Sequence, residues 1–243
     1  MFLIYVQHIF QALDHSPEIK SMSYIDDIGL ITGSPCARTN GIRLQLAVQR
    51  LCKVAERSQI QFDMDKTEYI HFHKGHALIE TGITINTGLR AIEVLPQKQI
   101  KWLGMWLDRK LTFKKHVEVR CAAATRAFHS IRRLSNTSKG LSFQATRQLY
   151  IACVEAVGAY GVPCWWDHNH SQISGFERLQ NSALRIMLGQ FKTAPIGPME
   201  IEAAIPPIHI QFDKITRFYR IRVLKLQPDH PVRKIITPPK KAN

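Results

Sequence analysis

The sequence lacks any closely paired cysteines. Its five cysteines, at positions 36, 52, 121, 153 and 164, are odd in number and never form a C-x-x-C motif. This argues against a disulfide framework and against a simple zinc ribbon. A reducing intracellular compartment fits such cysteine usage best.

Long apolar runs and an excess of glycine or proline are also missing. The apolar start, residues 1–13, is too short for a membrane span and lacks the basic segment and cleavage site of a secretion signal. We therefore expect a core helix there and no membrane partner. With 45% hydrophobic residues but only 13 glycines and 12 prolines, the chain should be globular, with one or two ordinary cores.

Acidic residues are scarce as well. Only 19 residues are Asp or Glu, whereas 33 are Lys or Arg, which gives a formal net charge of +14. Such a balance is expected of a nucleic-acid binder. Ribosomal, membrane-surface and heparin-binding proteins share it, so charge alone leaves the partner open.

The first part of the chain carries strand-like segments around one amphipathic helix. Residues 19–33 hold two β-prone runs around Asp26 and Asp27, which predicts a hairpin with two carboxylates at its tip. From Asn40 onward, apolar residues recur at helical spacing, which predicts a helix covering a sheet. We expect a small α+β layer that ends near residue 108, with strand-like segments at residues 66–73, 83–86, 89–94 and 100–107.

Beyond residue 112 the pattern becomes helical. Apolar residues repeat at helical spacing over residues 117–131, and Ser142 is a suitable N-cap for a second helix. A third helix is predicted to end at Gly189, because glycine readily adopts the left-handed conformation found at helix ends.

The last part of the chain is predicted to add two helices and a tail. A short helix should follow Pro198, and a basic helix should span residues 208–226. Residues 228–243 have the prolines and lysines of a linker or frayed end. The α+β chain is thus predicted to comprise three parts: residues 1–108, residues 109–227 and residues 228–243.

Asp26 and Asp27 are the first candidates for chemistry. Two-metal phosphoryl transfer needs at least two converging carboxylate-bearing elements, because the ions lie about 3.5–4 Å apart and bridge nucleophile, phosphate and leaving group. The pair supplies only one such element. Taken alone, two adjacent aspartates are also typical of a solvated turn.

Several short motifs follow one another in order along the chain. They are YIDD at residues 24–27, KTE at residues 66–68 and KWLGMWLD at residues 101–108, followed by LTFKKH (111–116), PCWW (163–166) and LQNSALRIMLG (179–189). The ordered series resembles the reverse transcriptases of non-LTR (LINE-type) retrotransposons, with their Y-x-D-D, K-T-E and primer-grip motifs. The resemblance covers nearly the whole chain.

This resemblance implies a fold, a cofactor and partners. It implies the C-terminal part of a palm, an antiparallel sheet with helices, in residues 1–108, and an all-α thumb-like bundle with a connection region in residues 109–227. The intact parent would extend a DNA primer on an RNA template, using dNTPs and Mg²⁺. Residence in the nucleus would follow from a retrotransposon origin.

The resemblance also implies roles for the first two motifs. Asp26 would ligate the catalytic magnesium with Asp27 beside it, and Tyr24 would lie near the primer end. Lys66 would lie near the departing pyrophosphate, where an ammonium can neutralise or protonate an oxygen. The alternative for Lys66 is a surface lysine paired with a neighbouring carboxylate, Asp65 or Glu68.

Primer and template contacts are predicted at two places. Trp102, Leu103 and Gly104 belong to the segment that resembles the primer grip, and Trp102 could stack on a base or pack within the protein. A basic helix face would contact template–primer phosphates, or remain solvated surface. It comprises Lys114, Lys115, Arg120, Arg126, Arg132 and Arg133.

The sequence departs from the family pattern before the hairpin. The family has a further metal-binding aspartate, fingers and a template-binding loop upstream, whereas Met1 follows all of these and Asp14 does not match. Asp26, Asp27 and water are too few ligands for two-metal catalysis, so we expect no polymerisation by this chain alone. A non-catalytic nucleic-acid-binding module and a transposon relic without function are the alternatives.

Two groups of histidines and cysteine could in principle meet a metal. Neither has the spacing of a standard zinc site, so structural roles are expected for both. They are His71, His73 and His76, and Cys164, His168 and His170.

Overall fold

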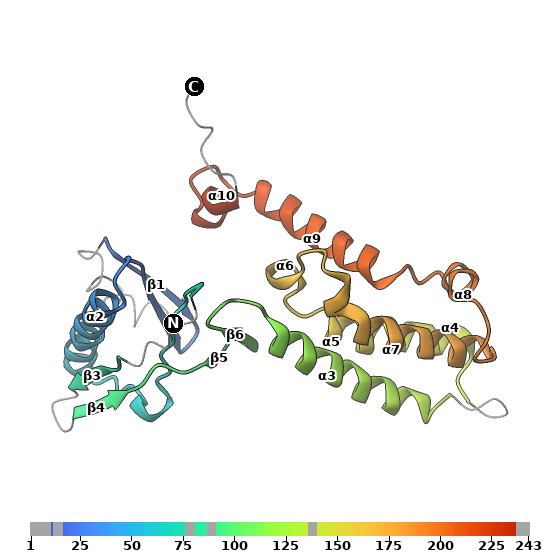
Figure 1. Cartoon of the computed structure of the whole chain (residues 1–243), viewed down its shortest axis with the longest axis horizontal. Coiled ribbons are helices and arrows are strands. Elements are labelled where there is room, and N and C mark those ends of the chain that lie inside the picture. The colour runs from blue at the N-terminus through green and yellow to red at the C-terminus, as the bar shows by residue number, and fades with distance from the viewer. Residues whose placement is uncertain (1–10, 12–16, 76–80, 87–90, 136–139, 237–243) are drawn as a thin grey trace. The chain divides into compact units, whose positions relative to one another are not determined.

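The structure of the chain is a computed structural model that describes residue 11 and residues 17–75, 81–86, 91–135 and 140–236 (Figure 1). The helix expected over residues 1–13, apart from Gln11, lies outside the described residues, as do Asp14 and His76. Two compact units are present. We call Met1–Trp102 with Leu107–Leu111 the hairpin unit, and Leu103–Trp106 with Thr112–Asn243 the helical unit.

The predicted α+β class is confirmed, because small two-stranded antiparallel sheets come first and helices dominate afterwards. In the hairpin unit, β1 (Ile19–Tyr24) pairs with β2 (Asp27–Thr32) through the two-residue connection expected at the aspartate pair. The helix α2 (Ala37–Arg57) buries one stripe of side chains, Ala47, Leu51 and Ala55, against apolar residues of this hairpin.

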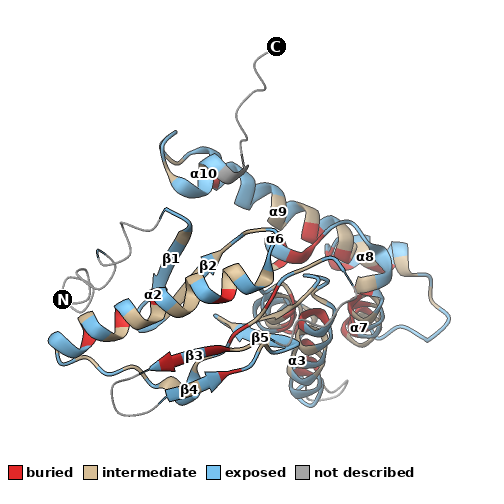
Figure 2. Cartoon of the chain, turned by 60° about the vertical axis from the view of Figure 1, so that its left-hand side comes forward, coloured by how far each residue is buried: buried red, intermediate tan, exposed pale blue. Residues whose placement is uncertain are grey.

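A second hairpin lies against another stripe of the same helix. The strand β3 (Ile83–Asn86) pairs with β4 (Ala91–Val94) and alternates buried and exposed residues, as a half-covered strand should. Its buried residues pack with Tyr69 and with Leu44 and Val48 of α2. Figure 2 shows the buried positions along α2 and β3.

Two predicted strands are wrong. Residues 66–73 do not form a strand: the 3₁₀ helix η1 (Met64–Lys66) is followed by extended chain with a single bridge, Tyr69 to Pro96. Residues 100–107 are not one strand but parts of β5 (Gln99–Trp102) and β6 (Met105–Asp108). The chain reverses at Leu103 and Gly104, whose φ angles of 46° and 78° match the two positive values of a type I′ hairpin turn.

The helical unit is built from short and long helices in sequence. They are α3 (Lys114–Arg132), α4 (Phe143–Leu149), the π-helix η2 (Tyr150–Glu155), α5 (Ala156–Gly158), α6 (Val162–Trp165), α7 (His170–Leu188), α8 (Ile196–Ala203), α9 (Ile208–Leu224) and α10 (Pro231–Ile236). The predicted helix ends are confirmed at Ser142, whose side chain caps α4, and at Gly189, which follows α7 with a φ of 63°.

Two predictions near the end of the chain need correction. The short helix begins before Pro198 rather than after it, because proline is tolerated in a first turn, where the backbone N–H has no helical partner. Residues 231–236 of the expected linker form α10, which also has proline at its start. The helix predicted over residues 208–226 is confirmed as α9.

An aromatic cluster forms the centre of the helical unit. The ring of Trp165 stacks with Phe176 at a centroid distance of 6.5 Å and meets Phe212 edge-on at 5.3 Å. These three residues come from α6, α7 and α9, so the cluster joins helices distant in sequence. Figure 2 shows further buried positions on α3 and α7. In the part of the chain that the structure describes, no helix has the length and apolar character needed to cross a bilayer.

Candidate functional site

The aspartate pair lies at the tip of the β1–β2 hairpin. Tyr24 pairs with Asp27, so Ile25 and Asp26 form the two-residue turn. Ile25 has a φ of 56°, a conformation that is strained for a β-branched residue by about 1–3 kcal/mol. The side chains of Tyr24, Asp26 and Asp27 are exposed, so both carboxylates are accessible.

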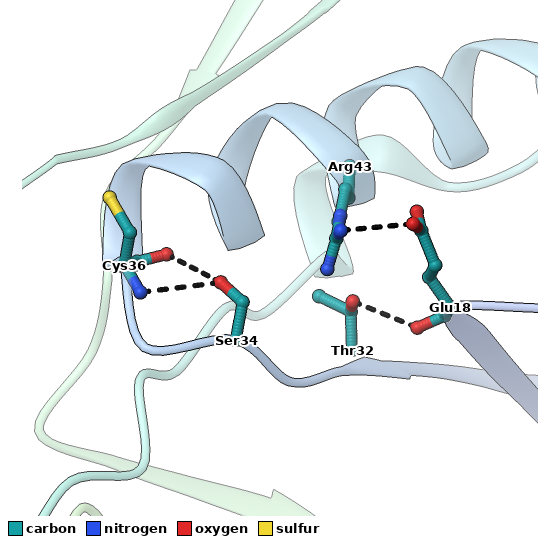
Figure 3. A network of polar contacts seen from close by, with 5 residues as sticks. All are labelled: Glu18, Thr32, Ser34, Cys36 and Arg43. Carbon is teal, nitrogen blue, oxygen red and sulfur yellow. Dashed lines mark hydrogen bonds and ion pairs between the residues drawn. The ribbon is translucent and has the colours of Figure 1, made fainter.

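Polar contacts fasten the open end of this hairpin to α2 (Figure 3). The Arg43 guanidinium lies 3.0 Å from the carboxylate of Glu18, and the Thr32 hydroxyl donates a 2.9 Å hydrogen bond to the Glu18 carbonyl. Beyond β2, the Ser34 hydroxyl donates to the carbonyl of Cys36 and accepts from its N–H just before α2 begins. The hairpin is thereby held at its base, while its tip is free to present Asp26 and Asp27.

The hairpin unit has a cavity of about 510 Å³ beside the aspartate pair. Asp26 and Asp27 line it together with Lys66 and Trp102, which belong to two other predicted motifs. The remaining lining comes from α2, from β2, from residues 61–69 and from Ile83, Ile100 and Lys101. Three motifs that are far apart in the sequence therefore meet at one concave surface.

Lys66 pairs with a residue that the sequence analysis did not select. Its ammonium lies 2.8 Å from a carboxylate oxygen of Asp63, so Lys66 is an exposed lysine in an ion pair, as the alternative predicted, but its partner is Asp63 rather than Asp65 or Glu68. The hydrogen bond to Asp63 raises the pKa of Lys66, and the negative charge of Asp26 adds a smaller contribution. The same bond lowers the pKa of Asp63. The i, i+3 spacing of the two residues was the available sequence signal.

The residues around the aspartate pair are too few for a complete two-metal magnesium centre. Asp63 is bound by Lys66, and the Glu68 carboxylate accepts a 3.3 Å hydrogen bond from the Lys101 N–H. Among the described residues, no third carboxylate, imidazole or thiol joins Asp26 and Asp27 within 4.8 Å. Of the four carboxylates that line the cavity, Asp63 and Glu68 are thus already bonded to other groups of the protein, which leaves Asp26 and Asp27 as the candidate magnesium ligands.

The residues of the third motif divide between the two units. In the hairpin unit, Trp102 is half-buried against Gly29, where an added Cβ would lie 3.1 Å from its ring. In the helical unit, the Tyr160 hydroxyl donates a 2.6 Å hydrogen bond to the carbonyl of Leu103 and holds the turn formed with Gly104. The two alternatives for Trp102, stacking on a base and packing within the protein, therefore both stay open: its ring packs against β2 and also lines the cavity.

A buried histidine supports the same turn. The Nε2–H of His116 donates to the carbonyl of Tyr160 at 3.0 Å, and its Nδ1 accepts from the Trp106 N–H at 3.4 Å. Burial lowers the pKa of His116, which favours the neutral ring that this arrangement requires. Sequence reasoning missed the roles of both residues: His116 was quoted only as the last residue of the LTFKKH motif, and Tyr160 lies in none of the motifs.

The predicted basic face is only partly available to phosphates. Lys114 and Lys115 are exposed in the first turn of α3, and Arg126, Arg132 and Arg133 are also exposed. Arg120 is half-buried instead, with its guanidinium 5.0 Å above the ring of Tyr160. It therefore packs within the helical unit.

The two histidine groups differ in their surroundings. The Tyr69 hydroxyl lies 2.6 Å from Nε2 of buried His71, whose pKa is lowered chiefly by burial. His168 pairs with Asp213 at 3.1 Å, whereas burial raises the pKa of the Cys164 thiol. The ring of His170 lies beside the ring of His209, a residue outside both predicted groups, at a centroid distance of 5.0 Å.

Comparison with known proteins identifies two similar sequences from Drosophila melanogaster. One, described as "Probable RNA-directed DNA polymerase from transposon BS", is 24% identical over 223 residues, or 88% of this chain. The other, "Probable RNA-directed DNA polymerase from transposon X-element", is 25% identical over 173 residues, or 70% of this chain. The chain spans only 24% and 18% of the lengths of these curated relatives. No family model and no solved structure matches the chain.

Proposed function

Because this chain is a distant homologue of the RNA-directed DNA polymerases of non-LTR transposons, we propose that it supplies part of a reverse transcriptase. In this proposal the hairpin unit belongs to the palm, and the helical unit is the thumb and connection region. The observation that carries the proposal is the cavity at which Asp26, Asp27, Lys66 and Trp102 meet.

The proposed chemistry assigns a distinct task to each side chain of the cavity. Asp26 and Asp27 would hold one side of a magnesium ion, which would need further ligands from outside the described residues. Lys66 keeps its positive charge, since Asp63 raises its pKa, and its three N–H donors can neutralise the oxygens of a departing pyrophosphate. Tyr24, exposed beside the turn, contacts the primer end.

Template and primer contacts are proposed on both units. Trp102 stacks against a base at the cavity, and the turn of Leu103 and Gly104, fixed by Tyr160, supports the primer strand. Lys114 and Lys115 bind phosphates at the exposed start of α3. A retrotransposon enzyme with these substrates acts in the nucleus.

A non-catalytic nucleic-acid-binding module is the second candidate. It is favoured by the incomplete set of magnesium ligands and by exposed cations on two helices of the helical unit. On α9 these cations are Lys214, Arg217, Arg220 and Arg222. Binding of this kind weakens steeply with salt, because each neutralised phosphate releases counterions.

Both candidates are tested by measuring primer extension and primer binding in the same samples. The assay uses an RNA template with a DNA primer, dNTPs and Mg²⁺, and compares the chain with Asp26→Ala. Asp229→Ala, which removes an exposed carboxylate from the helical unit, controls for charge alone.

We expect salt-sensitive binding without dNTP incorporation by the unmodified chain. Binding should be weaker and less salt-dependent in a variant with Lys114→Ala and Lys115→Ala. Incorporation that is lost in Asp26→Ala alone would show that the chain is a complete catalyst. Absence of both binding and incorporation would reject both candidates and favour a relic without function.

A further inference from the structure

A second group of metal-binding side chains lies in the helical unit, apart from the aspartate pair. His170 is the first residue of α7, Glu177 lies two turns further along the same helix, and His209 lies in the first turn of α9. One ligand atom from each residue lies within 4.8 Å of the others. Within the described ranges, no other three histidine, cysteine or acidic side chains converge in this way.

We propose that His170, Glu177 and His209 form a binding site for a zinc-type divalent cation that joins the starts of α7 and α9. Two imidazoles and one carboxylate match the ligands that zinc takes in sites with three protein ligands and one bound water. Such a set suits a borderline-soft ion better than magnesium, which prefers oxygen ligands alone. The site is therefore distinct from the proposed catalytic one and does not rest on the polymerase function.

Trp166 connects the two helix starts that carry the histidines. The ring of Trp166 meets His170 edge-on at 6.0 Å, and its N–H donates a 2.7 Å hydrogen bond to Asp213 of α9. Asp213 lies one turn after His209, so Trp166 links the beginning of α7 to the helix that carries the second histidine. His168 also contacts the Asp213 carboxylate, at 3.1 Å. Glu177 is therefore the carboxylate that lies with the rings of His170 and His209.

Glu177 and His209 are half-buried, whereas His170 is exposed. Among the described residues, none forms an ion pair or a hydrogen bond with the Glu177 carboxylate, so its oxygens are available for a cation. Zinc bonds of about 2.0–2.2 Å require tetrahedral ligand atoms about 3.4 Å apart, and rotation of the exposed His170 ring can close the remaining gap.

The negative charge of Glu177 is essential to this arrangement. Both histidines lie in first turns of helices, where the backbone dipoles disfavour a cation. A glutamine at position 177 keeps an oxygen that can bind the ion but loses the negative charge. Binding should therefore weaken strongly although the shape of the site is preserved. This makes Glu177→Gln, which preserves shape, the most informative substitution.

The experiment measures Zn²⁺ binding by competition with a chromophoric chelator at neutral pH. We expect one ion per chain, unaffected by excess Mg²⁺, and affinity at least about tenfold lower in Glu177→Gln and in His209→Asn. His168→Asn is the matched control: it removes a neighbouring imidazole outside the group and should keep the affinity of the unmodified chain.

Two further readouts separate binding from folding. Bound Co²⁺ should give the visible absorption of a tetrahedral N/O site in the unmodified chain and in His168→Asn, but not in Glu177→Gln. Zn²⁺ should raise the unfolding temperature of the same two proteins only, because an ion that binds the folded state stabilises it. Equal affinity of the unmodified chain and Glu177→Gln, or loss of binding in His168→Asn, would overturn the proposal, as would no binding at all.

Discussion

The two units differ in how they bury their apolar side chains. Among the described residues, the helical unit has one continuous core cluster drawn from α3, α4, η2, α6, α7, α8 and α9. The hairpin unit has two small clusters on neighbouring stripes of α2, and β1 exposes nearly all its side chains. The hairpin unit, which contains the cavity beside Asp26 and Asp27, therefore has the smaller core, and the ion pair of Glu18 with Arg43 adds a polar contact between its first hairpin and α2.

This contrast shows how stability and accessibility are divided within one chain. Exposed carboxylates, an exposed lysine and a strained turn contribute little to folding, but they are what a substrate can reach. The aromatic cluster of the helical unit contributes much more, because each buried ring removes a large apolar area from water. The following substitutions test the division, beginning with the largest expected effect.

Phe176→Ala should destabilise the helical unit by about 3–5 kcal/mol, because it removes a ring packed between Trp165 and Phe212. Hydrogen exchange should then accelerate in α3, α7 and α9 and change little in α2. Leu51→Ala, which truncates the core under the first hairpin, should give the reverse pattern. Equal acceleration in both units after either change would mean that they unfold together.

Acid should weaken both units through buried histidines. Burial lowers the pKa of His116 in the helical unit and of His71 in the hairpin unit, so the unfolded chain binds more protons below the ordinary histidine pKa of about 6.5. Stability should therefore fall as the pH decreases from about 7 toward 5. Half-buried Glu155, whose pKa is raised chiefly by desolvation, acts in the opposite direction at lower pH.

Urea unfolding at several pH values measures this effect. Hydrogen exchange, followed segment by segment, separates the two units. His116→Gln should reduce the pH dependence of stability in the helical unit, and His71→Gln should reduce it in the hairpin unit. If the stability of the unmodified chain is unchanged between pH 7 and pH 5, folding does not require a neutral His116. The proposed support of the Leu103 turn by the neutral ring would then be wrong.

Gly29→Ala should cost about 1 kcal/mol or more, since the added Cβ would lie 3.1 Å from the Trp102 ring and 3.2 Å from Met22. Gly33→Ala is the matched control, because nothing lies within 4 Å of a Cβ there. Thermal unfolding compares the two variants. An equal response would show that the hairpin does not pack on Trp102.

The smallest effect on stability is expected from Lys66→Ala. Its ion pair with Asp63 is exposed to solvent, where such pairs contribute little, so the unfolding midpoint should not move. The pKa of Asp63, now lowered by Lys66, should rise toward its ordinary value and can be followed by NMR titration. An unchanged Asp63 pKa would mean that the pair does not form in solution.

Much of the local structure follows from sequence pattern. The hairpin at the aspartate pair, the cap at Ser142 and the helix end at Gly189 each depend on residues close together in the chain. The two wrong strands arose where distant residues decide, whereas the helix starts near Pro198 and at Pro231 depend on the local tolerance of proline in a first turn. Residues 66–73 look strand-like but find only one bridge, and residues 100–107 turn at Leu103, a residue type that seldom has a positive φ.

The candidate sites show the same limit. The motifs selected Asp26, Asp27 and Lys66 as candidates, whose roles remain predictions, but they indicated neither the Asp63 partner nor the cavity that these residues line together. His170 was first grouped with Cys164 and His168 by closeness in sequence, whereas the fold places it with Glu177 and His209. Convergence of two helices cannot be inferred from the spacing along either one.

The bond from Tyr160 to the Leu103 carbonyl joins residues 57 positions apart. Contacts of such sequence separation form late in folding, because a long loop must first be closed, whereas a two-residue hairpin such as β1–β2 closes within microseconds. The turn of Leu103 and Gly104 should therefore acquire its final shape only after the helices behind it have assembled. During synthesis, the aspartate hairpin would emerge and close well before the turn of Leu103 and Gly104 is ordered.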